Sequence, residues 1–241
     1  MAENPLKIDH KHIIDSLVEI RFVPLNRKTS FIELLGAVSK IVPEYNYTPS
    51  DVPKQIRAEL PQFQFAVEAT LIGPDFSIGV GSNSLVFNCQ NGYKTWGVFF
   101  PFISNIIGVV SKLSTIKEIK RVGIRFTNFF ATVNDLSKFN VSFHAGDLNQ
   151  KDTSEMVLKW STMGKVIAYN VTLANNASVQ NRGLAPGTLL DVDAYIFDLS
   201  LGIGDKALLD KIEFVHSKEK EMFFSLLERK FLQSLNPVYS K

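Results

Sequence analysis

The chain has 241 residues, of which 45% are hydrophobic and 21% are charged, so a wholly disordered protein is excluded. A net charge of +2, from 26 basic and 24 acidic residues, excludes a strong overall attraction to nucleic acid or anionic membranes. The single cysteine, Cys89, excludes an intramolecular disulfide.

The first regular segments predicted along the chain are a strand and a helix. Leu17 to Phe22 alternates apolar and charged residues with period two, which is typical of a strand with one buried face. Pro24 ends this strand. Phe31 to Val42 carries an apolar stripe at helical spacing, with Ser30 as the expected N-cap, so a helix is predicted there.

The middle of the first half predicts an irregular connection followed by strands. The connection is Tyr45 to Pro61, which is rich in proline and turn-forming residues. Three strand-like runs follow, at Gln62–Leu71, Phe76–Val80 and Ser84–Gln90. A helix from Trp96 to Leu113 is expected to close the unit, although Pro101 lies inside it.

The pattern of the first strand then occurs a second time. The sequence Val-x-Ile-Arg-Phe is found at Val18–Phe22 and at Val122–Phe126, an offset of 104 residues. The same offset relates two further pairs of segments, which begin near Leu85 and Leu189 and near Trp96 and Ser200. Three correspondences in one order and at one spacing predict an internal duplication.

The second half predicts more strands and a long final helix. The strands are expected at Asn140–His144, Glu155–Ser161, Val166–Ala174 and Leu189–Phe197. The helix is expected from about Asp205, as its N-cap, to Leu235.

Strands that cluster between helices, without regular βαβ alternation, predict an antiparallel α+β fold. We expect two tandem related units, each an antiparallel sheet with packing helices in a β-α-β-β-α-like order. The expected domains are residues 1–115 and 116–241, with one continuous pseudo-symmetric domain as the alternative.

Several motifs occur in a fixed order along the chain. They are Leu-Val-Glu-Ile-Arg-Phe, Trp96, Lys-Arg-Val-Gly-Ile-Arg-Phe-Thr-Asn, Leu-Leu-Asp-Val-Asp-Ala-Tyr and a closing amphipathic helix that contains His216. From Leu17 to Leu235, this set resembles a sporadically distributed family of bacterial and archaeal proteins of unknown function. The resemblance implies no activity, cofactor or catalytic residue. The patchy distribution of that family is compatible with functions in defence or in mobile elements.

Two arginines at matching positions of the repeated strands are candidate ligand-binding residues. Arg21 and Arg125 both lie on the polar face of their strand. Two guanidinium groups related by a pseudo-dyad could clamp a carboxylate or a phosphate. Pairing with acids on neighbouring strands is the structural alternative.

Asp191, Asp193 and Tyr195 share the polar face of a strand and form the second candidate group. Carboxylates about 6.5–7 Å apart along a strand could hold a divalent cation or divide acid and base roles. Alternatively, the two aspartates form salt bridges across the sheet to Arg125 or Arg21, or simply face water.

Each of the other signals in the sequence also has a structural alternative. Asn175 to Thr188 is a long polar loop in which Asn181 and Arg182 are candidate ligand contacts. Asp9-His10-Lys11-His12 offers two imidazoles for a transition metal, or is a solvated tail. His216 is expected to be half-buried, and Cys89 to behave as a small hydrophobic residue. Lys112 to Arg121 is the densest basic segment and has aromatic residues downstream, a combination found in sites that bind single-stranded RNA.

The sequence therefore predicts a non-enzymatic binding or interaction protein that engages a protein or a small anionic ligand, with no cofactor, no metal ligand and no catalytic residue. A metal-dependent enzyme on a phosphate-bearing substrate and an RNA-binding protein are the alternatives. The polar first residues lack a signal-peptide core, and the apolar run Trp96 to Val110 is too short to span a bilayer comfortably. We therefore expect a soluble cytoplasmic protein with no membrane partner, and a homodimer stays open.

Overall fold

The structure is a computed structural model that describes residues 5–142, 144–145, 148–149, 155–179 and 185–239. It has the predicted α+β fold with a large antiparallel sheet. The chain divides into two compact units: unit 1 comprises Met1–Asp15, Arg125–Ala194 and His216–Lys241, and unit 2 comprises Ser16–Ile124 and Tyr195–Val215. This division follows contacts in space, and the duplication with its boundary between residues 115 and 116 stays a prediction.

In the described part of the chain, the strands of the main sheet follow the order β2-β3-β4-β5-β1-β6-β11-β10-β9. Outward from the central β1 and β6, one side carries β5, β4 and β3, and the other carries β11, β10 and β9. The strand bounds are β1 Ile13–Pro24, β2 Asn46–Pro49, β3 Ala69–Ile72, β4 Phe76–Val80, β5 Ser84–Cys89, β6 Ile116–Ala131, β9 Val157–Met163, β10 Ala168–Ala177 and β11 Gly187–Leu201. A separate two-stranded sheet pairs β7, His144–Ala145, with β8, Leu148–Asn149.

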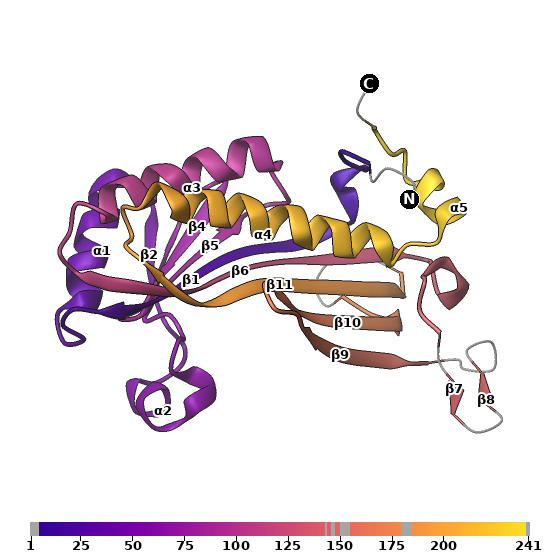
Figure 1. Ribbon diagram of the computed structural model, residues 1–241, viewed down its shortest axis with the longest axis horizontal. Helices are drawn as coiled ribbons and strands as arrows, with labels where there is room; N and C mark the ends of the chain where they lie inside the picture. The colour runs from indigo at the N-terminus through magenta and orange to yellow at the C-terminus, as the bar shows by residue number, and fades with distance from the viewer. Residues whose placement is uncertain (1–4, 143, 146–147, 150–154, 180–184, 240–241) are drawn as a thin grey trace. The chain divides into compact units, whose positions relative to one another are not determined.

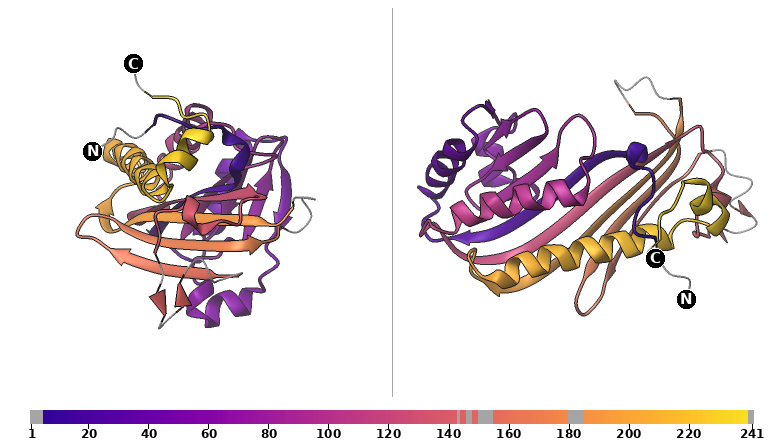
Figure 2. Two further views of the ribbon diagram at one scale, coloured as in Figure 1. Left: turned by 90° about the vertical axis from the view of Figure 1, so that its right-hand side faces the viewer. Right: turned by 90° about the horizontal axis from the view of Figure 1, so that it is seen from above.

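Unit 2 has a core of aromatic and aliphatic side chains between its strands and two helices. The helices are α1, Ser30–Ile41, and α3, Trp96–Val110, which pack against each other. Helix α3 reaches β4 and β5 through aromatic contacts. The ring of Phe102 stacks on that of Phe76 with centroids 4.4 Å apart and meets that of Phe87 edge to face with centroids 6.5 Å apart. A short helix, α2, Lys54–Glu59, lies on the other side of these strands from α3 (Figures 1 and 2).

The segment between α1 and β4 differs from the prediction. The expected irregular connection contains β2 and α2, and the expected strand from Gln62 begins with a 3-10 helix at Pro61–Phe63. Backbone hydrogen bonds from Phe63 to Leu60 and from Ala66 to Phe63 keep this segment turned, so strand β3 starts only at Ala69. Proline content marked the turns and could not reveal the pairing of β2 with β3.

Unit 1 packs strands β6, β9, β10 and β11 against the end of a long helix. Helix α4 spans Lys206–Ser225, and a short helix α5 spans Arg229–Ser234 (Figure 1). The buried apolar residues of this core are Ile8, Phe130, Leu136, Phe139, Met156, Val171, Leu173, Leu190, Val192, Phe223, Phe224, Leu226, Leu227, Phe231 and Leu235.

The predicted single helix from Asp205 to Leu235 is therefore wrong at its C-terminal end. The chain leaves the helical path because Leu227 forms a β-bridge with Phe139, and the Glu228 amide donates to the Lys138 carbonyl. Glu228 then caps α5, since its Oε2 accepts hydrogen bonds from the amides of Lys230 and Phe231 at 2.8 and 3.0 Å.

Two further predictions need correction. Ser30 is the first residue of α1 and not its cap, because its hydroxyl donates to the carbonyl of Ser82 at 2.8 Å. The strand expected at Asn140–His144 is absent from residues 140–142, where the Asn140 amide group instead donates to the carbonyls of Ser225 and Leu227.

Gly108 lies on the exposed side of α3, and a methyl group there would meet no atom within 4 Å. Because glycine costs a helix about 0.5–1 kcal/mol relative to alanine, Gly108→Ala should raise the free energy of unfolding by that amount in urea denaturation. Gly187→Ala is the control with the opposite sign, since its methyl group would collide with the carbonyl oxygen of Phe130. A loss of stability in Gly108→Ala would contradict the packing of α3.

Candidate functional site

Charged and aromatic side chains of unit 2 form a group on the polar face of β1 and β6, which we call the Glu19 cluster. Its members are Glu19, Arg21, Phe65, Arg121 and Tyr195. Alternation along β1 places Glu19 and Arg21 on the face opposite the buried Val18, Ile20 and Phe22, so both charged side chains point away from the core.

One carboxylate contacts both guanidinium groups of the cluster. Oε2 of Glu19 lies 2.9 Å from Nε of Arg21, and the same oxygen accepts a hydrogen bond from Nη1 of Arg121. The Nε–H group of Arg21 does not point at Oε2 of Glu19, so this contact is an ion pair and not an aligned hydrogen bond. Because two guanidinium groups neutralise the Glu19 carboxylate, it repels a bound anion only weakly.

Aromatic rings hold both guanidinium planes. Cζ of Arg21 lies 4.4 Å from the ring centroid of Phe65, and Cζ of Arg121 lies 4.3 Å from that of Tyr195. Both distances are within the range of cation–π attraction. Phe65 follows the 3-10 helix at Pro61–Phe63, so the turned segment after α2 is what brings its ring over Arg21.

Gly123 provides space for the Arg121 side chain. A Cβ atom at Gly123 would lie 2.6 Å from Nη1 and 3.0 Å from Cζ of Arg121. The guanidinium group therefore lies across its own strand, over Gly123. A larger residue at this position would push Arg121 away from Glu19 and Tyr195.

Arg21 is the member of the cluster that can bind a further group. Its side chain is 31% exposed. Among the residues that the structure describes, Glu19 and Phe65 are its partners, and neither of its Nη atoms has a hydrogen bond. Two terminal donors on a guanidinium that is already held in place suit a carboxylate or a phosphate.

In unit 1, Arg125 and Asp191 form a bidentate salt bridge between β6 and β11. The Nε–Oδ1 distance is 2.7 Å and the Nη2–Oδ2 distance is 2.8 Å. The hydroxyl of Thr127 donates to Oδ1 of Asp191 at 3.0 Å. The hydrogen bonds from Arg125 to Asp191 raise the pKa of Arg125. The structural alternative of a salt bridge across the sheet is therefore confirmed for this pair.

Asp193 continues the polar face of unit 1 towards β10 and β9. Its Oδ2 accepts a hydrogen bond from the side-chain amide of Asn170 at 3.2 Å, and Asn170 accepts one from the hydroxyl of Ser161 at 2.7 Å. Asn170 and Ser161 are directly paired in the β9–β10 register. Asp193 is thus part of a chain of polar groups across three strands.

The predicted ligand residues fall into three sets. Arg21 and Tyr195 belong to unit 2, and Arg125, Asp191 and Asp193 belong to unit 1. Asn181 and Arg182 lie outside the described residues. The clamp by two matched arginines stays a prediction.

Histidine and cysteine positions do not assemble into a metal site in the described part of the chain. There, no three His, Cys, Asp or Glu side chains lie close enough together to hold a metal ion. The ring of His12 packs against that of Phe130 in a tilted geometry with centroids 4.9 Å apart, and burial lowers the pKa of His12, so this residue is not part of a solvated tail. Cys89 is half-buried.

The basic segment predicted for RNA binding has few of the features of a single-strand site. Lys112 and Lys117 are exposed, and Lys120 forms a 2.7 Å ion pair with Glu118. The aromatic residues downstream, Phe126, Phe129 and Phe130, are all buried and cannot stack on bases. The RNA-binding alternative therefore gains no support from these side chains.

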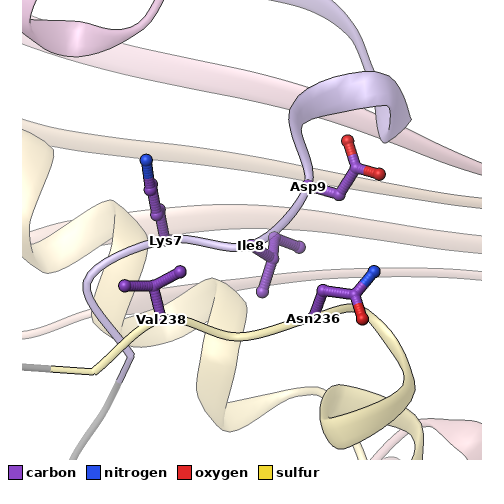
Figure 3. A pocket seen from close by; sticks show the side chains of 5 residues that line it. All are labelled: Lys7, Ile8, Asp9, Asn236 and Val238. Atoms are coloured by element: carbon purple, nitrogen blue, oxygen red, sulfur yellow. The ribbon is translucent and has the colours of Figure 1, made fainter.

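Residues 7–9 and 236–238 lie side by side in unit 1 and line an open hollow of about 260 Å³ (Figure 3). Lys7 and Val238 form a β-bridge, with the Val238 amide donating to the Lys7 carbonyl at 2.8 Å. The lining residues are Lys7, Ile8, Asp9, Asn236 and Val238. Because the backbone beside this hollow is already paired between Lys7 and Val238, we assign the hollow a structural role.

Sequence reasoning missed a buried carboxyl group on α4. Glu219 is only 4% exposed, and its Oε1 has no hydrogen-bond partner. Burial raises its pKa well above the usual value, and the negative charge of Asp191 adds to the shift. The residue falls on the apolar stripe of α4 between Val215 and Phe223, and this spacing is the signal that could have identified it.

No protein-family model matches the chain, and no curated protein matches it. The described helices include none that is long and apolar enough to cross a membrane.

Proposed function

We propose that the chain is a non-enzymatic binding protein and that Arg21 contacts an anionic group, a carboxylate or a phosphate, on its ligand. The observation that carries this proposal is the state of the Arg21 side chain. Glu19 and Phe65 hold it, it is partly exposed, and within the described residues its two Nη atoms have no partner.

The arrangement is suited to binding because the arginine is already ordered. A flexible arginine loses side-chain entropy when it binds, at a cost of about 0.5–1.5 kcal/mol. In this protein the Phe65 ring and the Glu19 carboxylate already order the Arg21 side chain before a ligand binds, so little further side-chain entropy is lost on binding. A planar guanidinium with two parallel donors then favours planar or tetrahedral oxyanions over other ligands.

The ligand is expected to be a protein segment or a small molecule that carries such a group. The cluster needs no cofactor to bind it. The cytoplasmic location and the bacterial or archaeal origin expected from the sequence remain part of the proposal.

Isothermal titration calorimetry with inorganic phosphate and with acetate tests the proposal on the full chain. Arg21→Gln should weaken binding of the better anion by about 10- to 100-fold, which corresponds to the loss of a charge-assisted hydrogen bond. Arg21→Lys should give an intermediate loss, because it keeps the charge but not the two parallel donors.

Arg27→Gln is the matched control. Arg27 is an exposed arginine of the same unit. Its replacement removes the same charge and should change the dissociation constant by less than about twofold. Equal losses in Arg21→Gln and Arg27→Gln would show general charge attraction and would refute a site at Arg21.

A further inference from the structure

We propose that strand β9 is a self-association edge, which pairs antiparallel with β9 of a second copy of this chain. β9 ends the strand order of the main sheet and is paired with β10 alone among the described residues (Figure 1). Its outer side therefore presents backbone N–H and C=O groups that a further strand can use. This inference is independent of the site at Arg21.

The two edges of the sheet differ in their protection. The opposite edge, β2, has four residues and ends in Pro49, which has no N–H to donate. β9 has seven residues and no proline, and Lys159 is its one charged residue. Short strands, prolines and charged side chains are the usual means of blocking an edge. The β2 edge has the first two of these, whereas the β9 edge has only the charge of Lys159.

The exposed side chains of β9 also favour a partner. Val157 and Met163 are 57% and 73% exposed, and they point to the same face as Lys159 and Ser161. On the other face, Leu158 and Trp160 pack against the core of unit 1. A second strand would cover the two exposed apolar side chains and extend the half-buried face.

The sequence of β9 selects the second copy and one register. When two copies pair about a two-fold axis at Trp160, all seven residues are paired, and Val157 of one copy faces Met163 of the other. Lys159 then faces Ser161. Centring the pair on Lys159 would place two lysines opposite each other, and centring it on Ser161 would leave Val157 and Leu158 unpaired.

Two substitutions at Ser161 test the register. The Ser161 side chain is exposed and donates one hydrogen bond, to Asn170, so any replacement loses the same intramolecular contact. Ser161→Lys places the new charge opposite Lys159 twice in the dimer, and Ser161→Glu places an opposite charge there. Sedimentation velocity over a concentration series should show a dimer for the parent chain. The dissociation constant should be raised about 2- to 30-fold by Ser161→Lys and lowered by a similar factor by Ser161→Glu.

Hydrogen exchange locates the interface in the same samples. Amides of β9 should gain protection as the protein concentration rises, whereas amides of β2 should not change. A chain that stays monomeric at every concentration overturns the proposal. So does a dimer whose dissociation constant is the same in both Ser161 variants.

Discussion

Replacing Glu219 by methionine should raise the free energy of unfolding at pH 8 by about 1–3 kcal/mol. The carboxyl group is buried between apolar residues of α4, and its Oε1 has no hydrogen-bond partner. Methionine has a similar length and no polar atom, so the variant removes the desolvation cost and keeps the packing.

The gain should depend on pH in a defined direction. The pKa of Glu219 is raised in the folded protein above the ordinary value of 4.5, so the folded state holds a proton that the unfolded state loses. The parent chain therefore loses stability as pH rises above 4.5, towards the folded pKa. The advantage of Glu219→Met should be small at pH 4 and larger at pH 8.

His216 changes the stability with pH in the opposite direction, and it is present in both the parent chain and Glu219→Met. Burial lowers its pKa from 6.5 to about 3, so its contribution is lost as pH falls from 6.5 towards 3. It therefore cancels in the difference between the two stability curves.

Urea denaturation at pH 4, 6 and 8 provides the measurement. Glu221→Met is the control, since Glu221 lies on the exposed side of the same helix. It should change stability by less than about 0.5 kcal/mol at any pH. A difference between Glu219→Met and the parent chain that is equal at pH 4 and pH 8 would contradict the buried, protonated carboxyl group.

The second large effect is expected at the salt bridge in unit 1. Asp191→Ala should lower the free energy of unfolding by about 2–3 kcal/mol, because Arg125 and Thr127 both lose their acceptor. Arg125 is 47% exposed and can regain water, which limits the loss. A double-mutant cycle with Arg125→Ala should give a coupling energy of about 1–2 kcal/mol.

An exposed ion pair of similar length provides the comparison. Lys218 and Glu221 on α4 have an N–O distance of 2.6 Å, and the carboxylate side chain of this pair is 46% exposed, against 12% for Asp191. Their coupling energy should be below about 0.5 kcal/mol and should fall at high salt, whereas that of Arg125 and Asp191 should change less. Equal coupling energies for the two pairs would show that burial of Asp191 contributes nothing.

Local sequence patterns predicted the regular elements well where one periodicity dominates. Strict alternation placed β1, β6 and β11, and the predicted strand Phe76–Val80 is confirmed by β4. The closing helix from Trp96 was also found, in spite of Pro101. These segments each bury one continuous face, so their pattern is set by local geometry.

Elements that depend on distant partners were not predictable in the same way. The end of α4 is decided by the pairing of Leu227 with Phe139, which lies far away in sequence. Ser30 does not cap α1 because the carbonyl of Ser82 is close enough to accept its hydroxyl. A pattern within one segment contains no information on such contacts.

The candidate site was predicted in part. Alternation identified Arg21 as a polar-face residue, and a salt bridge between Asp191 and Arg125 was one of the predicted alternatives for this aspartate. The role of Phe65 was missed, because its segment was expected to be a strand and not a turn over β1. Gly123 was seen as part of a motif, but only the course of the Arg121 side chain explains it.

Nuclear magnetic resonance of the arginine side-chain Nε–Hε groups tests the proposed site most directly. During titration of the full chain with inorganic phosphate, the Arg21 signal should shift and reach saturation, while that of Arg27 should stay nearly constant. Equal shifts of both signals, or a constant Arg21 signal while calorimetry reports binding, would contradict a ligand contact at Arg21.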